Sequence, residues 1–298
     1  MTQPRPLPKQ AVLVVNTKSR RGEKLMREAR EKLTGAGVEL LSVHGIKEPG
    51  ELIPTVGRIL QDKPPMVIVG GGDGSLSCSV DSFVGKDTVF ALLPFGTANS
   101  FARTMNIPLD LDGAVDVIAN GQRRRIDLGM IDGDYFANCA ALGVSPLIAE
   151  TVPHGLKKAL GRVGYLSWAA YQMTRFRSFQ VTLSEGDRRE TFRALEVRIA
   201  NGRFHGGTEL IEEAEVDDGR IVVQAVTGHT KSYLMWSWLT ALLKLDARRM
   251  TTREFIGKAV RIETDRPLPI SIDGEVLART PVTARVAAGV IEVAAPRA

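Results

Sequence analysis

The sequence contains few of the features that mark secreted or membrane-embedded proteins. Its 298 residues include two cysteines, Cys78 and Cys139, far apart in the chain. A disulfide framework is therefore not expected, and a reducing cytoplasm fits best. The longest apolar run, residues 233–243, is about half the roughly 20 residues that a membrane-spanning helix needs. Residues 1–10 are polar, carry three prolines and lack the apolar stretch of a signal peptide. We expect a cytoplasmic protein that is not integral to a membrane.

The charge pattern also lacks the footprint of a nucleic-acid-binding protein. The net charge of +5 is a modest basic excess, which suits nucleotide phosphates or acidic lipid headgroups and is equally an ordinary value for this length. No long run of lysine and arginine with interleaved aromatic residues is present, so no nucleic-acid partner is expected. None of the four histidines has zinc-ligand spacing to a cysteine, and we interpret all of them as incidental: His44, His154, His205 and His229.

The first part of the chain alternates strand and helix patterns. Short β-branched runs fall at residues 11–15, 38–43, 66–69 and 88–93, and segments with helical spacing fall at residues 24–34, 49–60, 74–83, 97–105 and 111–119. This alternation predicts a mostly parallel sheet flanked by helices.

After about residue 125 the pattern changes to short strands separated by turns. The expected strands are residues 126–131, 135–140, 180–184, 193–200, 221–225, 259–264, 268–272, 283–286 and 290–294. This spacing predicts an antiparallel β-sandwich, interrupted by helical stretches at 156–176 and 231–249. We therefore expect a flexible arm (1–10), an α/β nucleotide-binding domain (11–126) and an all-β domain (127–298), with the site in the cleft between the domains. The last strand is a candidate to return to the first domain.

A glycine-rich loop follows the third expected strand. Three consecutive glycines precede Asp73 and Gly74, and a helix follows. Glycines let the backbone approach a ligand closely, and amides at a helix N-terminus can hold phosphate. A carboxylate beside bound phosphate suits a Mg²⁺ ligand, which would be Asp73. A plain strand-to-helix turn is the alternative. The loop is neither a Walker A motif nor a dinucleotide-binding fingerprint.

A second loop of the same construction, residues 93–103, follows the next strand. In a parallel sheet both loops would lie at the carboxyl ends of neighbouring strands, where α/β folds bind ligands. Thr97 would supply a hydroxyl and an amide to phosphate. Asn99 either caps the following helix or contacts phosphate.

With these motifs the sequence resembles the diacylglycerol kinase catalytic family, which includes bacterial lipid kinases and sphingosine kinases. Five segments carry the resemblance in the family's order: residues 16–22, 71–75, 96–103, 201–207 with the Asp-Asp-Gly turn at 217–219, and 272–275. The resemblance extends from about residue 11 to residue 296.

The resemblance implies specific roles. It implies ATP binding at Asn16, Lys18, Val69, Gly70, Gly71, Gly72, Asp73, Gly74, Ser75, Thr97 and Asn99. It makes Asp273 and Glu275 the catalytic acids near the lipid hydroxyl, without deciding which of the two is the base. It implies a structural Mg²⁺ held by the side chain of Asp218, with Glu215 and Arg220 contributing, for example through backbone oxygens. From pattern alone, both Asp-Gly segments also fit simple turns.

The sequence departs from the family pattern at several positions. Thr17 replaces a proline, Ser75 replaces a threonine, and Glu213 stands where a proline is common. Ser100 replaces an acid, which removes a candidate Mg²⁺ ligand and leaves Asp73 without a partner carboxylate.

The expected activity is therefore Mg²⁺- and ATP-dependent phosphorylation of a hydroxyl on a membrane-derived, diacylglycerol-like lipid. The stretch 231–249, apolar with flanking cations, either lies at the inner membrane surface or packs on the sandwich or in a homodimer interface. The alternatives are a soluble-substrate kinase of the NAD kinase type and a nucleotide- or lipid-binding regulator without catalysis.

Overall fold

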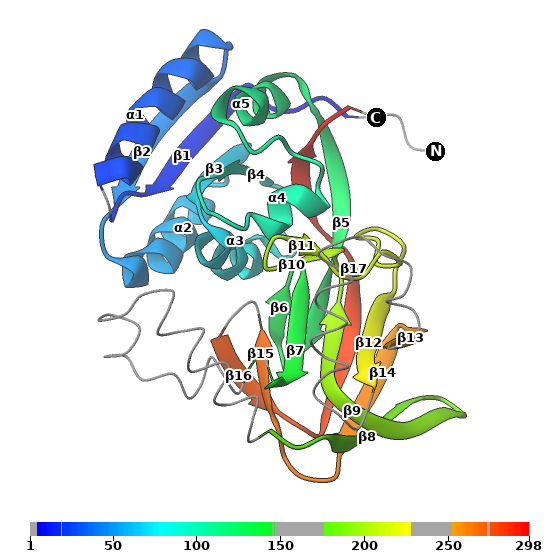
Figure 1. The fold of residues 1–298 in the computed structure, drawn as a ribbon. Helices are drawn as coiled ribbons and strands as arrows, with labels where there is room; N and C mark the ends of the chain where they lie inside the picture. Colours follow the sequence, from blue (N-terminus) through cyan, green and yellow to red (C-terminus); the bar gives the residue numbers. More distant parts are fainter. Residues whose placement is uncertain are drawn as a thin grey trace.

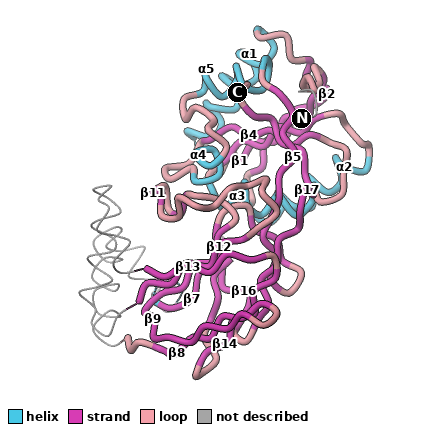
Figure 2. The backbone as a smooth tube through the Cα atoms, turned by 90° about the vertical axis from the view of Figure 1, so that its right-hand side faces the viewer, coloured by secondary structure: helices cyan, strands magenta, loops and turns pink. Residues whose placement is uncertain are grey.

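The computed structural model describes residues 5–18, 20–144, 146, 176–227, 252–272 and 275–297. The helical stretch predicted at 231–249, most of the one at 156–176, and the candidate base Asp273 lie outside these residues. Helices surround one half of the molecule, and the other half consists of strands (Figures 1 and 2). Among the described residues, no helix combines the length and apolar character needed to cross a membrane.

The helical half is an α/β domain built on four parallel strands in the order β4-β3-β1-β2. The strands are β1 (Gln10–Asn16), β2 (Glu39–Ile46), β3 (Met66–Gly71) and β4 (Val89–Pro94). The helices are α1 (Arg20–Gly35), η1 (Pro49–Glu51), α2 (Leu52–Gln61), α3 (Asp73–Val80), η2 (Asp81–Phe83), α4 (Ser100–Thr104) and α5 (Leu111–Asn120). Every residue of β3 and β4 is buried, as expected where helices cover both faces of a parallel sheet. The predicted α/β domain is confirmed.

The second half is an antiparallel β domain. Its strands are β5 (Gln122–Ile131), β6 (Asp134–Phe136), β7 (Cys139–Gly143), β8 (Phe179–Glu185), β9 (Arg188–Ala200), β10 (Phe204–His205), β11 (Thr208–Glu209), β12 (Ile221–Thr227), β13 (Thr252–Gly257), β14 (Ala259–Thr264), β15 (Pro269–Ile272), β16 (Glu275–Arg279) and β17 (Val282–Ala295). The first half of β9 pairs with β8, and its second half pairs with β7 and β12. The strand thereby joins two layers that enclose an apolar core with Val197, Ile199 and Ile262. The predicted sandwich is confirmed.

Two long strands, β5 and β17, run through both halves (Figure 1). Near its end, β17 pairs in parallel with β4 at Val293 and Phe90, so the last strand does return to the first domain. A bulge in β17 places the Gly289 amide 2.7 Å from one carboxylate oxygen of Asp127. The other oxygen of Asp127 accepts from Gly219 N at 2.7 Å. Asp127 therefore fixes the Asp-Asp-Gly turn to the strand that joins the domains.

Some strand boundaries differ from the sequence expectation. The single strand expected at 135–140 is two strands, β6 and β7, because β6 pairs with β5 whereas β7 pairs with β9. The two strands expected at 283–286 and 290–294 are one bulged strand. The sequence pattern missed β13 and β16, whose pairing partners lie elsewhere in the chain.

The N-terminal arm is ordered from Arg5 onward, in contrast to the expected flexible segment. The Arg5 carbonyl accepts from Arg123 N at 3.1 Å, and Pro6 bridges to Gln122. Leu7 is buried in the core of the α/β domain, and the Lys9 ammonium donates to Ala119 O at 2.7 Å. These contacts, which join positions more than a hundred residues apart, are not visible in local sequence.

The arm, β5 and β17 meet at a buried carboxylate, Glu292. Its side chain is 4% exposed and pairs with Arg5 at 2.7 Å, Arg125 at 3.1 Å and Arg123 at 3.3 Å. Burial alone would raise the pKa of Glu292, but the hydrogen bonds from Arg125 and Arg123 and the charge of Arg5 together hold it below its ordinary value. Three consecutive arginines occupy residues 123–125 near the domain boundary, and this one acid binds two of them, Arg123 and Arg125.

Replacing Glu292 with glutamine is expected to lower the free energy of unfolding at pH 7 by about 1.5–3 kcal/mol, the usual contribution of hydrogen bonds to a charged group. Because the folded pKa is depressed, this stabilisation is present above the unfolded pKa of about 4.3 and is lost as pH falls through the folded pKa. Urea denaturation at pH 7 and at about pH 3 would measure both effects. The difference between wild type and Glu292→Gln should shrink at the lower pH.

Glu263→Gln is the matched control, because Glu263 forms an exposed pair with Arg261 at 2.9 Å. It should change stability by less than about 0.5 kcal/mol. An equally small effect of Glu292→Gln would show that the three arginines do not stabilise the fold through this acid.

Candidate active site

Two glycine loops lie in contact at the carboxyl ends of β3 and β4. The strands are adjacent and parallel, with Gly71 opposite Pro94, and the Gly71 carbonyl accepts from Phe95 N at 2.9 Å. A Cβ atom on Gly96 would lie 2.7 Å from the Gly72 Cα, and one on Gly70 would lie 2.7 Å from the Phe95 ring. The absence of side chains is therefore required for the loops to pack together. The sequence placed both loops at this edge of the sheet, and the structure confirms that position.

The N-terminus of α3 provides amides for an anionic ligand. The helix begins at Asp73, and Gly72 at the N-cap position has no side chain to satisfy the first amides. The first intrahelical bond, from Leu76 N to Gly72 O, leaves the preceding amides without a partner from the helix. Together with the helix dipole, such amides favour phosphate.

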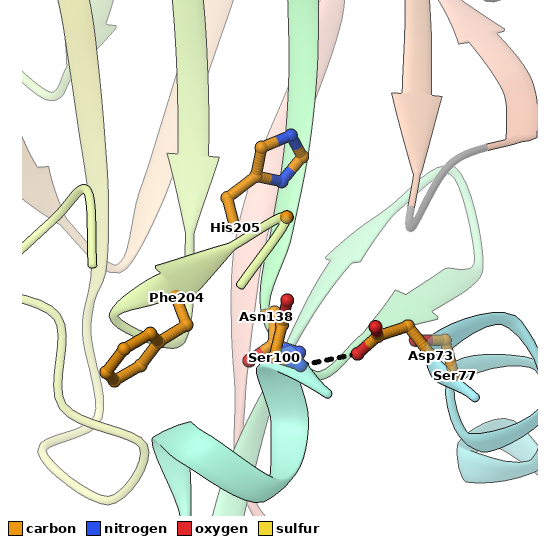
Figure 3. A pocket seen from close by; sticks show the side chains of 7 residues that line it. Asp73, Ser77, Ser100, Asn138, Phe204 and His205 are labelled. Atoms are coloured by element: carbon orange, nitrogen blue, oxygen red, sulfur yellow. Dashed lines mark hydrogen bonds between the residues drawn. The ribbon is translucent and has the colours of Figure 1, made fainter. Parts of the chain in front are cut away.

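Asp73 joins the two loops through one of its oxygens. Its Oδ1 accepts from Ser100 N at 2.5 Å, and its other oxygen has no hydrogen bond to a described residue (Figure 3). The Ser100 hydroxyl accepts from Gly207 N at 3.0 Å, which connects α4 to the β10–β11 hairpin of the second domain. The serine that replaces the family's acid is thus a structural link between the glycine loop and the second domain.

Asn99 supports the second loop rather than capping the helix. It is buried, lies in the left-handed region with φ of 49°, and makes no side-chain cap to α4. Its Oδ1 accepts from Gly96 N at 2.9 Å, and its amide donates to Gly96 O at 3.0 Å. The expected capping bond is therefore absent, and the side-chain amide holds the Gly96–Thr97 turn. Thr97 itself is exposed at the tip of that turn.

The first loop contacts the glycine loop through Asn16. The Asn16 amide donates to the Ser75 hydroxyl at 3.1 Å, and its oxygen accepts from Lys18 N at 3.2 Å. Lys18 is exposed beside them. The predicted nucleotide-binding residues of all three loops therefore lie at one edge of the sheet.

A cavity of about 190 Å³ lies between these loops and the second domain. It is lined by residues from both domains, labelled in Figure 3: Asp73, Ser77, Ser100, Asn138, Phe204 and His205. Sequence reasoning overlooked Ser77, Asn138 and His205, although His205 lies inside a segment that carried the family resemblance. His205, interpreted above as incidental, lines this cavity.

The His205 imidazole is half-buried and makes no hydrogen bond to a described side chain. Burial lowers its pKa below the ordinary value because it penalises the charged form, while Glu196 and Asp73 raise the pKa and Arg198 lowers it further. The imidazole is therefore neutral at pH 7.

The predicted metal residues of the Asp-Asp-Gly turn bind other side chains. Both Asp218 oxygens are occupied by Arg220, through its backbone amide at 2.9 Å and its guanidinium at 3.1 Å. Glu215 pairs with Arg203. The described residues contain no group of three or more carboxylate, histidine or cysteine side chains arranged to bind a metal ion. A Mg²⁺ at this turn would depend on backbone oxygens and stays a prediction.

The catalytic acids expected from the resemblance lie on the second domain. Glu275 begins β16, is exposed, and pairs across with Ile272 of β15. Ile272 in turn pairs with Ala140, two residues beyond the cavity-lining Asn138. The strands that flank Asp273 therefore belong to the part of the sheet that borders the cavity.

Gly96→Ala is expected to raise the KM for ATP by about ten- to a hundred-fold, because the added Cβ would displace the loop from Gly72 and small misplacements of binding groups are costly. Initial-rate kinetics against ATP would measure it. Gly57→Ala in α2 is the matched control, since its Cβ would meet nothing within 4 Å. Equal KM values for the two variants would contradict the tight packing of the loops.

Comparisons with known proteins agree with this arrangement. A family model of the diacylglycerol kinase catalytic domain matches residues 10–131. A second model, described as the YegS C-terminal NAD kinase beta sandwich-like domain, matches residues 138–295. The two models meet where the α/β fold gives way to the antiparallel strands.

Relatives and solved structures span most of the chain. A "probable lipid kinase YegS-like" protein of Klebsiella pneumoniae (strain 342) is 33% identical over 226 residues, covering 73% of this chain and 74% of that protein. A diacylglycerol kinase of Staphylococcus saprophyticus is 25% identical over 256 residues, covering 82% of this chain and 81% of that protein. A crystal structure of a diacylglycerol kinase from Bacillus anthracis str. Sterne shares the fold, with a TM-score of 0.76 and 20% identity. The match covers 99% of this chain and 98% of that chain. The chain therefore belongs to the diacylglycerol kinase catalytic family of lipid kinases.

Proposed function

We propose that this protein transfers the γ-phosphoryl group of ATP, in the presence of Mg²⁺, to a hydroxyl of a membrane-derived, diacylglycerol-like lipid. One observation carries the proposal. Asp73 lies beside unpartnered amides of α3 and borders a cavity whose opposite wall belongs to the second domain. This arrangement supports a nucleotide phosphate on one side and an acceptor on the other.

The residues present fit a nucleotide-bound Mg²⁺. Mg²⁺ in such sites is usually held by one or two carboxylates together with substrate phosphates. Asp73 has one oxygen committed to Ser100 N and one available to a cation. When bound, the ion supplies positive charge that offsets the negative charge developing during transfer.

The protein's own groups then account for the remaining requirements of the reaction. Backbone amides at residues 71–75 and the Thr97 hydroxyl bind and orient the phosphates. Asp273 or Glu275 accepts the proton of the lipid hydroxyl as its oxygen bonds to the γ-phosphorus. The bond between that phosphorus and the β–γ bridging oxygen breaks, and ADP leaves.

We further propose that the protein works in the cytoplasm and contacts the inner face of the membrane peripherally, where its substrate resides. Flotation with liposomes of phosphatidylglycerol and phosphatidylethanolamine tests this contact. Protein that stays at the bottom of the gradient would contradict it. Whether a homodimer forms can be measured by sedimentation in the same buffer.

Radiolabelled ATP, offered with separate acceptors, tests the activity itself. The acceptors are diacylglycerol, monoacylglycerol, ceramide, sphingosine, phosphatidylglycerol and NAD⁺. Label in a lipid, lost on addition of EDTA, is the expected result. Label in NAD⁺ alone would identify a soluble-substrate kinase, and ATP binding without transfer to any acceptor would identify a regulator.

A further inference from the structure

Asn138 is a buried side chain of the second domain whose two polar atoms have different surroundings. It lies between β6 and β7, is 4% exposed, and lines the cavity (Figure 3). Its Oδ1 accepts from the Thr104 hydroxyl of α4 at 2.8 Å. Its Nδ2 makes no hydrogen bond to a described residue and is not fully enclosed by protein atoms. The amide therefore presents two N–H donors to the cavity.

The backbone around Asn138 holds this side chain in one orientation. Its carbonyl accepts from Asn201 N at 2.8 Å and from Gly202 N at 2.9 Å. A Cβ atom on Gly202 would lie 2.7 Å from the Asn138 Oδ1 and 2.9 Å from the Thr104 hydroxyl. The two side chains are therefore packed against the Gly202 backbone, and Oδ1 cannot turn toward the cavity without losing its bond to Thr104.

Helix α4 relates this amide to Asp73 of the glycine loop. At its first residue, Ser100 N donates to Asp73 Oδ1 at 2.5 Å, and at its last residue Thr104 donates to Asn138. Residues four apart in a helix lie on one face, about 6 Å apart along the axis. Asp73 and Asn138 therefore border the same cavity and are anchored about one helical turn apart.

The amide donors select what the cavity can hold beside Asp73. A phosphoryl oxygen carries negative charge and can only accept hydrogen bonds, so it is complementary to an N–H group. The hydroxyl that attacks phosphorus is a poorer match, because a hydrogen bond donated to its oxygen would draw electron density from the lone pair that must bond to phosphorus. Phosphoryl transfer depends mainly on positioned groups that stabilise the charge on the transferred oxygens.

We propose that Asn138 is a further catalytic residue, whose Nδ2 donates a hydrogen bond to a non-bridging oxygen of the γ-phosphoryl group as that group is transferred. This inference rests on the proposed function and assigns to the reaction a donor from the second domain. Thr104 acts through Asn138 as a positioning residue. Both domains therefore contact the transferring phosphate, the first through the amides of the glycine loop and the second through this side-chain amide.

The test compares kcat and KM for variants of Asn138, with ATP and the lipid that the wild-type protein phosphorylates fastest. Asn138→Asp keeps the shape of the side chain and the acceptor for Thr104 but directs a negative charge at the phosphate, so kcat should fall by about 10²–10³-fold or more. Asn138→Ala removes the donor without adding charge, and kcat should fall by about 10²-fold. Its KM values for ATP and lipid should stay within about threefold of wild type, because the hydrogen bond acts mainly in the transition state.

Thr104→Val provides an independent variant, because it keeps the shape of the threonine and removes the hydroxyl that orients Asn138. We expect kcat to fall by about ten-fold with the KM for ATP unchanged. In the Asn138→Ala background the same change should have no further effect on kcat, since the group that it orients is gone. A threonine with a merely structural role would lower kcat by the same factor in both backgrounds.

Asn106→Asp is the matched control, because this exposed asparagine lies two residues beyond Thr104 and receives the same change of charge. It should keep wild-type kinetics. Thermal melts establish which variants are folded, and Thr104→Val carries the test if changes at position 138 prevent folding.

A kcat within about threefold of wild type in the folded variants would overturn the role of Asn138. A higher KM for the lipid at unchanged kcat would also overturn it, because the amide would then bind the acceptor and not the phosphate. A wild-type protein that phosphorylates no lipid would instead contradict the proposed function. The two failures are therefore distinguishable in one experiment.

Discussion

Asp73→Asn is expected to lower kcat/KM for ATP by about 10²–10³-fold while leaving the protein folded, the range seen when one charge-stabilising group is removed from an active site. The substitution is isosteric, and the asparagine Oδ1 can still accept from Ser100 N, so the bond between the two loops is preserved. What is lost is the negative charge on the oxygen that faces the cavity. The effect should appear mainly as weaker binding of Mg²⁺ and ATP.

The measurement is a titration of activity with Mg²⁺ at fixed ATP, supported by equilibrium binding of a fluorescent ATP analogue. Asp81→Asn is the matched control, at the other end of the same helical segment. Desolvation raises the pKa of Asp81 to about 6, with Asp134 adding to the effect and a hydrogen bond from the Tyr135 backbone opposing it. Its charge is not part of the site, so the control should keep wild-type kinetics. Identical Mg²⁺ titrations for wild type and Asp73→Asn would remove Asp73 from the metal site.

Asp273→Asn should lower kcat by about 10²–10⁴-fold, the usual contribution of a general base, with little change in the affinity for ATP. This split between kcat and nucleotide binding distinguishes a residue that acts on the acceptor from one that holds the nucleotide. Glu275→Gln, measured in parallel, decides which of the two acids is the base, because only loss of the base should abolish the dependence of kcat on pH at the acidic side.

Single-turnover transfer from radiolabelled ATP to lipid measures the chemical step, and fluorescence titration measures nucleotide binding. Asp265→Asn, in an exposed turn beside Arg266, is the control for loss of an acid on the second domain. Full single-turnover rates in Asp273→Asn would assign the base to another group.

The glycine loops show how much of the structure can be predicted from short stretches of sequence. A strand of buried β-branched residues, three glycines and an acidic residue opening a helix are all features of consecutive positions. They predicted β3, α3 and the turn between them with boundaries correct to within a few residues, and phosphate binding by the amides stays a prediction. The same holds for β1 and α1, whose apolar spacing is a property of one segment.

Prediction was less accurate where a residue's role depends on distant partners. Asn99 was expected to cap α4 or contact phosphate. Its side chain makes no cap to α4 and bonds to Gly96, and the contact with phosphate stays a prediction. Asp218 was expected to bind Mg²⁺, which stays a prediction, and sequence spacing did not show that its carboxylate accepts hydrogen bonds from Arg220. Both residue types suit several roles, and the choice among them is made by the surrounding backbone, which sequence spacing does not describe.

The sequence by itself therefore determined the two-domain architecture, the order of its elements and the position of the glycine loops, because helix and strand periodicity and glycine turns are local properties. Only the tertiary structure decided which side chains meet. The Glu292 cluster joins residue 5 to residue 292, Ser100 connects Asp73 to Gly207, and His205 lines the same cavity as Asp73 and Ser100. These contacts join residues that lie far apart in the chain and meet only in the folded protein, so local sequence patterns do not predict them.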